Sequence, residues 1–253
     1  MTSVRYAALA TAKIKMAATD HSAYILHSRP FQDDKLLLDL LLQAGGRCRV
    51  IARRPSKKKG GRSQWPLFTL YQLQLTGRGE LKTVSALEEL SAGWQLQAEF
   101  LFSALYLNEL ICRIWPADVH SDDLFGLYQH TLQALVRHQG EPAMLEPILR
   151  EFEFAILTEL GIALDCTLDA NGEAICADAC YQWHHEQGFV RAGQGFAGSD
   201  LLAISQQQWQ PQSLRVAKQL TRMVLKPLLG AQPLMSRSLF STVASSASAS
   251  ERT

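Results

Sequence analysis

The sequence has few cysteines and no long hydrophobic run, which argues against two broad classes of protein. Its longest apolar runs, LLLDLLL and AILTELGIAL, are interrupted and fall short of the about 20 apolar residues that span a bilayer. Five cysteines in 253 residues are an odd number and too few for a disulfide scaffold. We therefore expect no membrane partner and a reducing, cytoplasmic environment.

Sequence motifs of common catalytic sites are also missing. The chain contains no GxxxxGK[ST] phosphate loop and no GxSxG nucleophile elbow. His185 and Glu186 begin a zinc-protease pattern, but Phe189 stands where that pattern requires a second histidine. We therefore expect a binding protein rather than an enzyme, and a hydrolase with unrecognised catalytic residues is a remaining alternative.

Acidic residues are scarce in the first third of the chain, where basic residues are abundant. Residues 1–80 contain 14 Lys or Arg against 5 Asp or Glu, a net +9, whereas residues 81–253 contain 11 against 19, a net −8. The overall charge of +1 hides this segregation. Half of the sixteen residues from 47 to 62 are basic and none is acidic: Arg47, Arg49, Arg53, Arg54, Lys57, Lys58, Lys59 and Arg62.

Three explanations compete for this cluster of cations. It can be an ordinary solvated loop, or it can attract an anionic membrane, but SKKKGGR lacks the apolar face that an amphipathic anchor needs. A polyphosphate fits better, because Lys and Arg that neutralise phosphates release condensed counterions whatever the base sequence. The charge pattern therefore favours a nucleic acid as the partner.

Residues 21–93 have the alternating pattern of short β-strands. Cys48, Val50 and Ala52 share one face and Arg47, Arg49 and Arg53 the other, with Ile51 as the exception. PLFTLYQLQLT alternates apolar residues with Gln72, Gln74 and Thr76. KLLLDLLLQAGG is ambiguous because leucine favours helix, but its position between strand-like segments favours a strand that ends at the Gly45-Gly46 turn. Gly77-Arg78-Gly79 predicts a hairpin with Arg78 as a basic tip. Four or five such strands predict a small closed barrel.

The apolar period changes to three and four residues from residue 94 onward, which indicates helices. We expect one helix that ends at Pro116, a second capped by Ser121 to Asp123, a third from near Pro147 to Gly161, and a last one over about 212–229. The fold class is therefore α+β. Its predicted parts are an extension (1–20), a barrel (21–93), a helical domain (94–240) with an irregular insert (162–197), and a disordered tail (241–253).

Three further sets of residues are candidates for binding. Trp65 lies near the cations and either stacks a base or belongs to the barrel core, whereas Phe68 and Tyr71 fit the core better. Cys166, Cys176 and Cys180 are followed by two histidines, but their spacing matches no standard zinc site. A basic stripe on the last helix either faces solvent or docks an acidic peptide or strand: Arg215, Lys218, Arg222 and Lys226.

The whole pattern resembles RecO, a bacterial family of recombination mediators in DNA repair. Six segments carry the resemblance, in the family's order: AYILHSRPFQDDKLLLDLL (23–41), GRCRVIARR (46–54), GRGELKT (77–83), LYLNELICRI (105–114), REFEFAILTELG (150–161) and RVAKQLTRMVLKPLLGAQPLMSRSLF (215–240). The resemblance implies an N-terminal OB-fold barrel, a helical domain and a zinc-ribbon-like insert. Some members carry two CxxC pairs in that insert, and this chain does not, so we expect an insert without metal and no cofactor.

The resemblance also implies activities and partners. The family binds single- and double-stranded DNA, anneals complementary strands, and acts with RecR in the RecF pathway to load RecA onto strands coated by single-stranded DNA-binding protein (SSB). For this chain it implies a cytoplasmic, nucleoid-associated protein whose basic strand and loop, with Trp65 and Arg78, bind DNA. The stripe on the last helix would then bind the acidic tail of SSB. The alternative is a generic RNA- or ribosome-binding protein with an OB-fold.

Overall fold

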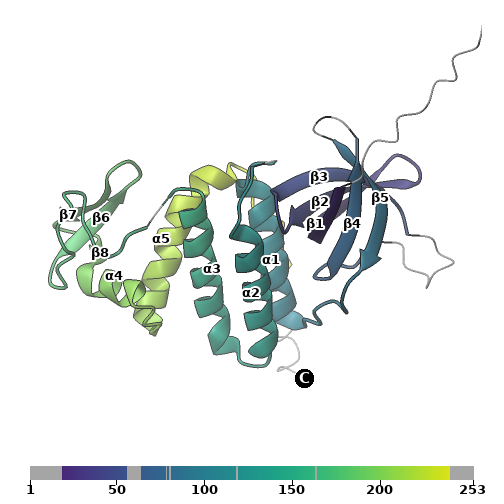
Figure 1. The fold of residues 1–253 in the computed structure, drawn as a ribbon. Helices are drawn as coiled ribbons and strands as arrows, with labels where there is room; N and C mark the ends of the chain where they lie inside the picture. The colour runs from purple at the N-terminus through teal and green to yellow at the C-terminus, as the bar shows by residue number, and fades with distance from the viewer. Residues whose placement is uncertain are drawn as a thin grey trace, which may run out of the picture.

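The computed structural model describes residues 19–55, 64–77, 79, 81–117, 119–162 and 164–239. Figure 1 shows three parts in a row: a β-barrel at one end, a layer of helices in the middle, and a small sheet with a short helix at the other end. Within the described residues, no helix is both long and apolar enough to cross a membrane.

The barrel has five strands in the order β1-β2-β3-β5-β4. Four pairings are antiparallel, and a short parallel pairing of β3 with β5, where Val50 lies beside Lys82, closes the ring. A barrel removes the exposed strand edges that an open sheet of this size would present. The strands are β1 (Thr19–Phe31), β2 (Lys35–Leu42), β3 (Gly46–Arg53), β4 (Leu70–Thr76) and β5 (Lys82–Glu89).

The alternation predicted for β3 and β4 is confirmed, since Val50 in β3 and Leu73 in β4 point into the barrel core. The ambiguous leucine-rich segment is strand β2, as its position predicted. Its continuous run of leucines has a physical reason, because both faces of the strand are buried. Leu38 and Leu40 belong to the barrel core, whereas Leu41 packs into the core of the helical layer.

The four predicted helices are confirmed. Trp115 and Pro116 follow the first, and the Ser121 hydroxyl accepts hydrogen bonds from the backbone N–H groups of Asp123 and Leu124 at 3.3 and 3.0 Å, which caps the second. Gly161, at φ +78°, follows the third. The elements are α1 (Ala98–Ile114), α2 (Leu124–Arg137), a 3-10 turn η1 (Pro142–Met144), α3 (Leu145–Glu159) and α5 (Pro211–Leu229).

The insert is more regular than the sequence predicted. It folds as an antiparallel sheet in the order β7-β6-β8, followed by an additional helix, so the expectation of irregular structure was wrong there. The strands are too short to show a clear period, and the sheet is held by aromatic packing, with the rings of Trp183 and Phe189 edge to face at 5.1 Å. The elements are β6 (Cys180–His184), β7 (Gly188–Ala192), β8 (Phe196–Ala197) and α4 (Gly198–Ser205).

Strand β1 of the barrel packs directly on helices α1 and α2. The Asn108 side chain donates to the carbonyl of Leu26 at 2.9 Å and accepts from the Tyr128 hydroxyl at 2.6 Å, inside the interface. The Tyr24 ring lies 5.3 Å from the ring of Phe125 and contributes to the core of the helical layer. These buried contacts join the barrel to the helices and so fix the orientation of the barrel relative to the helical layer.

Candidate nucleic-acid interface

Strand β3 brings two of the predicted DNA-binding cations to the surface at its end. Arg53 and Arg54 are both exposed. The backbone there is held in place, because the Arg54 N–H donates to the Asp34 carbonyl at 2.9 Å and the Trp65 indole donates to the Arg53 carbonyl at 3.4 Å. The two guanidinium groups therefore leave the barrel from a fixed strand end.

Further cations from neighbouring strands share the outer face of the barrel with Arg53. The strand register places Lys35 of β2 directly opposite Arg53, and Arg29 of β1 stands one pleat away on the same face. Arg49, at 43% side-chain exposure, lies two residues before Ile51 on that face. Arg29 and Lys35 were not identified as candidates from the sequence, although the alternation of inward and outward side chains along their strands could have placed them on the outer face.

Arg47 is not part of the exposed surface, although the sequence assigned it to DNA binding. Its side chain is 9% exposed and donates to the Asp39 carboxylate at 2.8 Å and to the Trp115 carbonyl at 2.9 Å. Both contacts lie where the end of α1 meets the barrel. A guanidinium held in this way is unavailable to a phosphate, so we correct its role to a structural one.

Trp65 is half-buried and packs against the barrel core. Its ring packs edge to face on Tyr71 at 6.1 Å, and its indole N–H is bonded at the strand end. Tyr71 is buried in the barrel core, as predicted. Phe68 is also buried, but in the core of the helical layer rather than in that of the barrel. The exposed edge of Trp65 lies beside Arg53, so stacking on a base stays a prediction.

Several predicted DNA-binding residues lie outside the described part of the chain. These are Lys57, Lys58, Lys59, Arg62 and Arg78. Their assignment therefore stays a prediction from the sequence.

The basic stripe on α5 divides into two parts. Lys218 and Arg222 line a groove of about 440 Å³ between α1, α3 and α5, whereas Arg215 and Lys226 are exposed outside it. Lys218 forms an ion pair with Glu146 of α3 across the groove. The remaining lining includes apolar surface from Tyr106, Pro142, Leu145 and Leu149 and two further cations, Arg150 and Arg237.

A buried carboxylate holds Arg150 in the floor of this groove. Glu153 accepts hydrogen bonds from Arg150 at 2.7 Å and from the Tyr106 hydroxyl at 2.6 Å, and its second oxygen accepts from Thr221. Burial and the neighbouring Glu153 raise the pKa of Tyr106 well above its usual value, so this hydroxyl stays a donor. Arg150 Nε is buried without a partner in the described structure. The groove thus joins apolar walls to fixed cations, which suits an acidic, hydrophobic peptide.

The cysteines of the insert are not arranged as a metal site. Cys166 is buried, Cys176 is exposed, and burial raises the pKa of the Cys166 thiol to about 12. Among the described residues, no three His, Cys, Asp or Glu side chains converge in a way that would hold a metal ion. A zinc-free insert nevertheless stays a prediction, since no metal analysis tests it.

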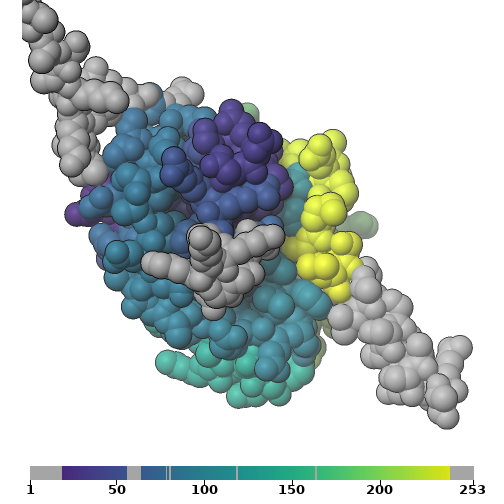
Figure 2. Space-filling model, turned by 90° about the vertical axis from the view of Figure 1, so that its right-hand side faces the viewer, coloured from purple at the N-terminus to yellow at the C-terminus, as the bar shows by residue number. Residues whose placement is uncertain are grey.

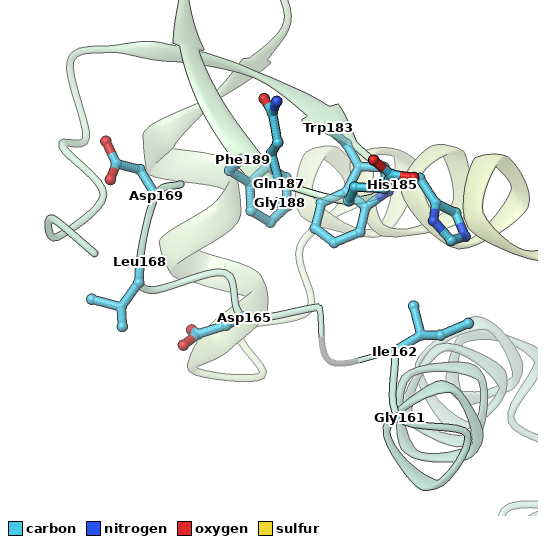
Figure 3. Close-up of a pocket in the computed structure, with 11 residues that line it drawn as sticks. Gly161, Ile162, Asp165, Leu168, Asp169, Trp183, His185, Gln187, Gly188 and Phe189 are labelled. Carbon is cyan, nitrogen blue, oxygen red and sulfur yellow. The ribbon is translucent and has the colours of Figure 1, made fainter. Parts of the chain in front are cut away.

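A pocket beside the insert is lined by polar side chains that diverge. Figure 3 shows the carboxylates of Asp165 and Asp169 pointing away from His185. Both acids are already used in local turns, because Asp165 accepts from the Thr167 N–H and Asp169 from the N–H of Asn171, each at 2.8 Å. Neither Asp165 nor Asp169 is therefore a partner of the histidine that suggested a zinc-protease pattern.

Comparisons with known proteins match the chain along nearly its whole length. The family model described as recombination protein O N terminal matches residues 16–92, and the one described as recombination protein O C terminal matches residues 95–238. The DNA repair protein RecO of Pseudomonas putida strain GB-1 is 40% identical over 227 residues, 88% of this chain and 97% of its own. That of Cellvibrio japonicus is 42% identical over 228 residues, 86% and 94% of the two chains. That of Shigella flexneri is 37% identical over 225 residues, 86% and 92%.

The structure defines an OB-like barrel protein with a helical second domain, because a parallel β3–β5 pairing closes five strands and a layer of helices follows. The two family models match these two parts in the same order. The chain therefore belongs to the recombination protein O family, a family of DNA repair proteins. The resemblance found in the sequence is confirmed.

Proposed function

We propose that this chain is a recombination mediator that binds single- and double-stranded DNA, anneals complementary strands, and helps RecR to load RecA on SSB-coated strands in the RecF pathway. One observation carries the proposal: cations from three neighbouring strands gather on one outer face and rim of the barrel. They are Arg29, Lys35, Arg49, Arg53 and Arg54. Cations so arranged can follow a phosphate backbone without reading its bases.

The proposed role is not enzymatic. Two complementary strands repel one another as polyanions, and a cationic surface that screens both of them lowers the barrier to pairing. Such annealing needs no nucleophile, no general base and no cofactor. The partners follow from the same proposal: DNA of both kinds, RecR, SSB, and RecA indirectly.

The groove between α1, α3 and α5 is the proposed site for the SSB tail. An acidic peptide with hydrophobic residues would place its carboxylates on Lys218 and Arg222 and its apolar groups on Leu145 and Leu149. Arg150, held by the buried Glu153, offers a further charged donor in the groove floor. This site lies away from the barrel face, so tail binding and DNA binding can occur together.

Annealing of complementary oligonucleotides tests the proposal, with strands either naked or coated by SSB. We expect the protein to accelerate annealing of both, and we expect deletion of the SSB tail to slow only the reaction on coated strands. Charge reversal of Arg53 and Arg54 should slow both reactions. A generic RNA-binding protein would instead bind RNA equally well and show no dependence on the SSB tail.

A further inference from the structure

The groove that we assign to the SSB tail already contains an acidic side chain paired with one of its cations. The Glu146 carboxylate, from the first turn of α3, accepts a hydrogen bond from the Lys218 ammonium of α5. Their side chains are 43% and 38% exposed. The pair is therefore open to solvent and to any ligand that enters the groove.

Two further acidic residues line the groove: Glu99, and Glu153, which is bonded to a groove cation but plays a different part from Glu146. Glu153 is buried and is held by Arg150, Tyr106 and Thr221 at once, so removing it would leave Arg150 buried without its anion. Glu146 is half-exposed, and its carboxylate can turn into solvent at little cost. It is therefore the acid that a ligand can displace.

We propose that Glu146 determines the specificity of this groove by occupying Lys218 as an internal stand-in for a ligand carboxylate. A peptide forms an ion pair with Lys218 only if it carries a carboxylate that displaces the carboxylate of Glu146. Neutral or weakly anionic peptides lose that contact and bind through apolar surface alone. This inference rests on the proposed binding of the acidic SSB tail.

The size of the effect follows from the exposure of the pair. A half-exposed ion pair is weak, so Lys218 is free of Glu146 in a substantial fraction of molecules. The apparent Kd of a competing ligand equals its intrinsic Kd divided by that free fraction, so the pair weakens binding only modestly. Removing the internal carboxylate should tighten binding of an acidic tail by about two- to fivefold. Salt should reduce this gain, because it screens both the pair and its competitor.

Titration of the full-length protein with a fluorescent SSB-tail peptide tests the inference. We expect Glu146→Gln to tighten binding of the acidic peptide and to leave unchanged the binding of an analogue whose carboxylates are amides. In a Lys218→Met background the gain from Glu146→Gln should vanish, since the pair acts as a unit. Glu186→Gln, an exposed change of equal charge on the insert, should have no effect. Glu146→Ala should repeat the result of Glu146→Gln.

The outcomes separate this inference from the proposed function. If the wild-type protein binds the peptide and neither variant of Glu146 tightens it, Glu146 is not a competitor and the tail site stands. If Glu146→Gln tightens both the acidic peptide and its amide analogue, the groove has merely become more apolar and the inference is wrong. If neither the wild type nor the variants bind the peptide, the tail site itself is wrong and the inference falls with it.

Discussion

Arg47 donates a hydrogen bond over 2.8 Å to the carboxylate of Asp39, and both side chains are less than a tenth exposed. The same guanidinium donates to the carbonyl of Trp115, directly after α1. A strand of the barrel is thereby tied to the end of a helix through a buried charge. Burial also raises the pKa of Cys112, in the last turns of that helix, to about 12, so the thiol stays neutral in this junction.

Removing Arg47 should therefore cost stability rather than DNA contacts. Arg47→Met leaves Asp39 buried with only the longer 3.3 Å contact to Arg49, and loss of one partner of a buried pair typically costs about 3–5 kcal/mol. Arg49→Met, at the exposed partner, should cost less than about 1 kcal/mol. Urea unfolding of the two variants measures the difference. If the two variants are equally stable and Arg47→Met binds DNA more weakly, Arg47 is a DNA-binding residue after all.

The exposed cations at the end of β3 should carry DNA affinity and its salt dependence. Replacing both Arg53 and Arg54 by Glu should weaken binding to single-stranded DNA. Replacing both Lys57 and Lys58 by Glu should have the same effect. Each lost phosphate contact should flatten the slope of log affinity against log salt by about 0.7 to 0.9. Fluorescence anisotropy at several salt concentrations gives the slope. A slope identical to that of the wild type would exclude these residues as phosphate contacts.

The barrel could be predicted from the sequence because a period of two survives wherever one face of a strand is buried. Leu73 is an example, since Gln72 and Gln74 flank it and its own side chain enters the core. Val50 also enters the core, although only Arg49 of its two neighbours is polar. The same reasoning failed at Arg47. Alternation places Arg47 and Arg53 on one outer face, but it does not reveal that α1 covers one end of that face.

The groove could be predicted only in part, for a similar reason. The stripe containing Lys218 and Arg222 follows from helical spacing within one element. Arg150 and Arg237 join it from segments that are distant in sequence, and Arg150 is held by a buried glutamate that looks like an ordinary helix residue. Tertiary packing, rather than local pattern, separates the cations of the groove from those of the solvent face.

The insert should contain no stoichiometric zinc. Cys166 is buried and Cys176 is exposed, and among the described residues no three His, Cys, Asp or Glu side chains converge as a metal site. Metal analysis of the purified protein tests this expectation. About one zinc per chain that disappears on Cys176→Ser would overturn it, and His184 or His185 would then be the fourth ligand.

Glu109 should stabilise the segment around Met235 and Ser236 in a manner that depends on pH. Burial opposes its ionisation, but hydrogen bonds from Ser236 and Met235 and the charge of Arg113 outweigh burial and lower the pKa of Glu109 below its usual 4.5. Because the folded pKa is lowered, the stabilisation is complete above the unfolded pKa and is lost as the pH falls through the folded value.

Glu109→Gln should accordingly lower the free energy of unfolding at neutral pH by about 1–2 kcal/mol, through weaker acceptors for the N–H groups of Met235 and Ser236. The difference from wild type should shrink as the pH falls below 4.5. Figure 2, which views the molecule from the barrel end, shows the yellow C-terminal stretch that these bonds hold. Urea unfolding at several pH values, with the exposed Glu186→Gln as control, checks both points. A difference that grows in acid would contradict the role of the carboxylate.

Two arginines of the stripe on α5 should differ in their effect on SSB-tail binding. Arg222 lines the groove, whereas Arg215 is exposed outside it and donates to the Pro211 carbonyl at 3.2 Å. Arg222→Glu replaces an attractive charge by a repulsive one beside the peptide carboxylates and should weaken tail binding by at least about tenfold. Arg215→Glu carries the same change of charge on the same helix and should leave tail affinity within about twofold, because exposed charges at a distance are screened.

Annealing of naked strands decides what the stripe does. If the groove is the tail site, Arg222→Glu slows annealing only on SSB-coated strands, because the barrel face that binds DNA is unchanged. If Arg222→Glu and Arg215→Glu slow annealing of naked strands alike and spare peptide affinity, the stripe extends the DNA surface and the tail binds elsewhere. If neither variant alters either reaction, the four cations only face solvent, and the charge of the groove has no part in binding SSB.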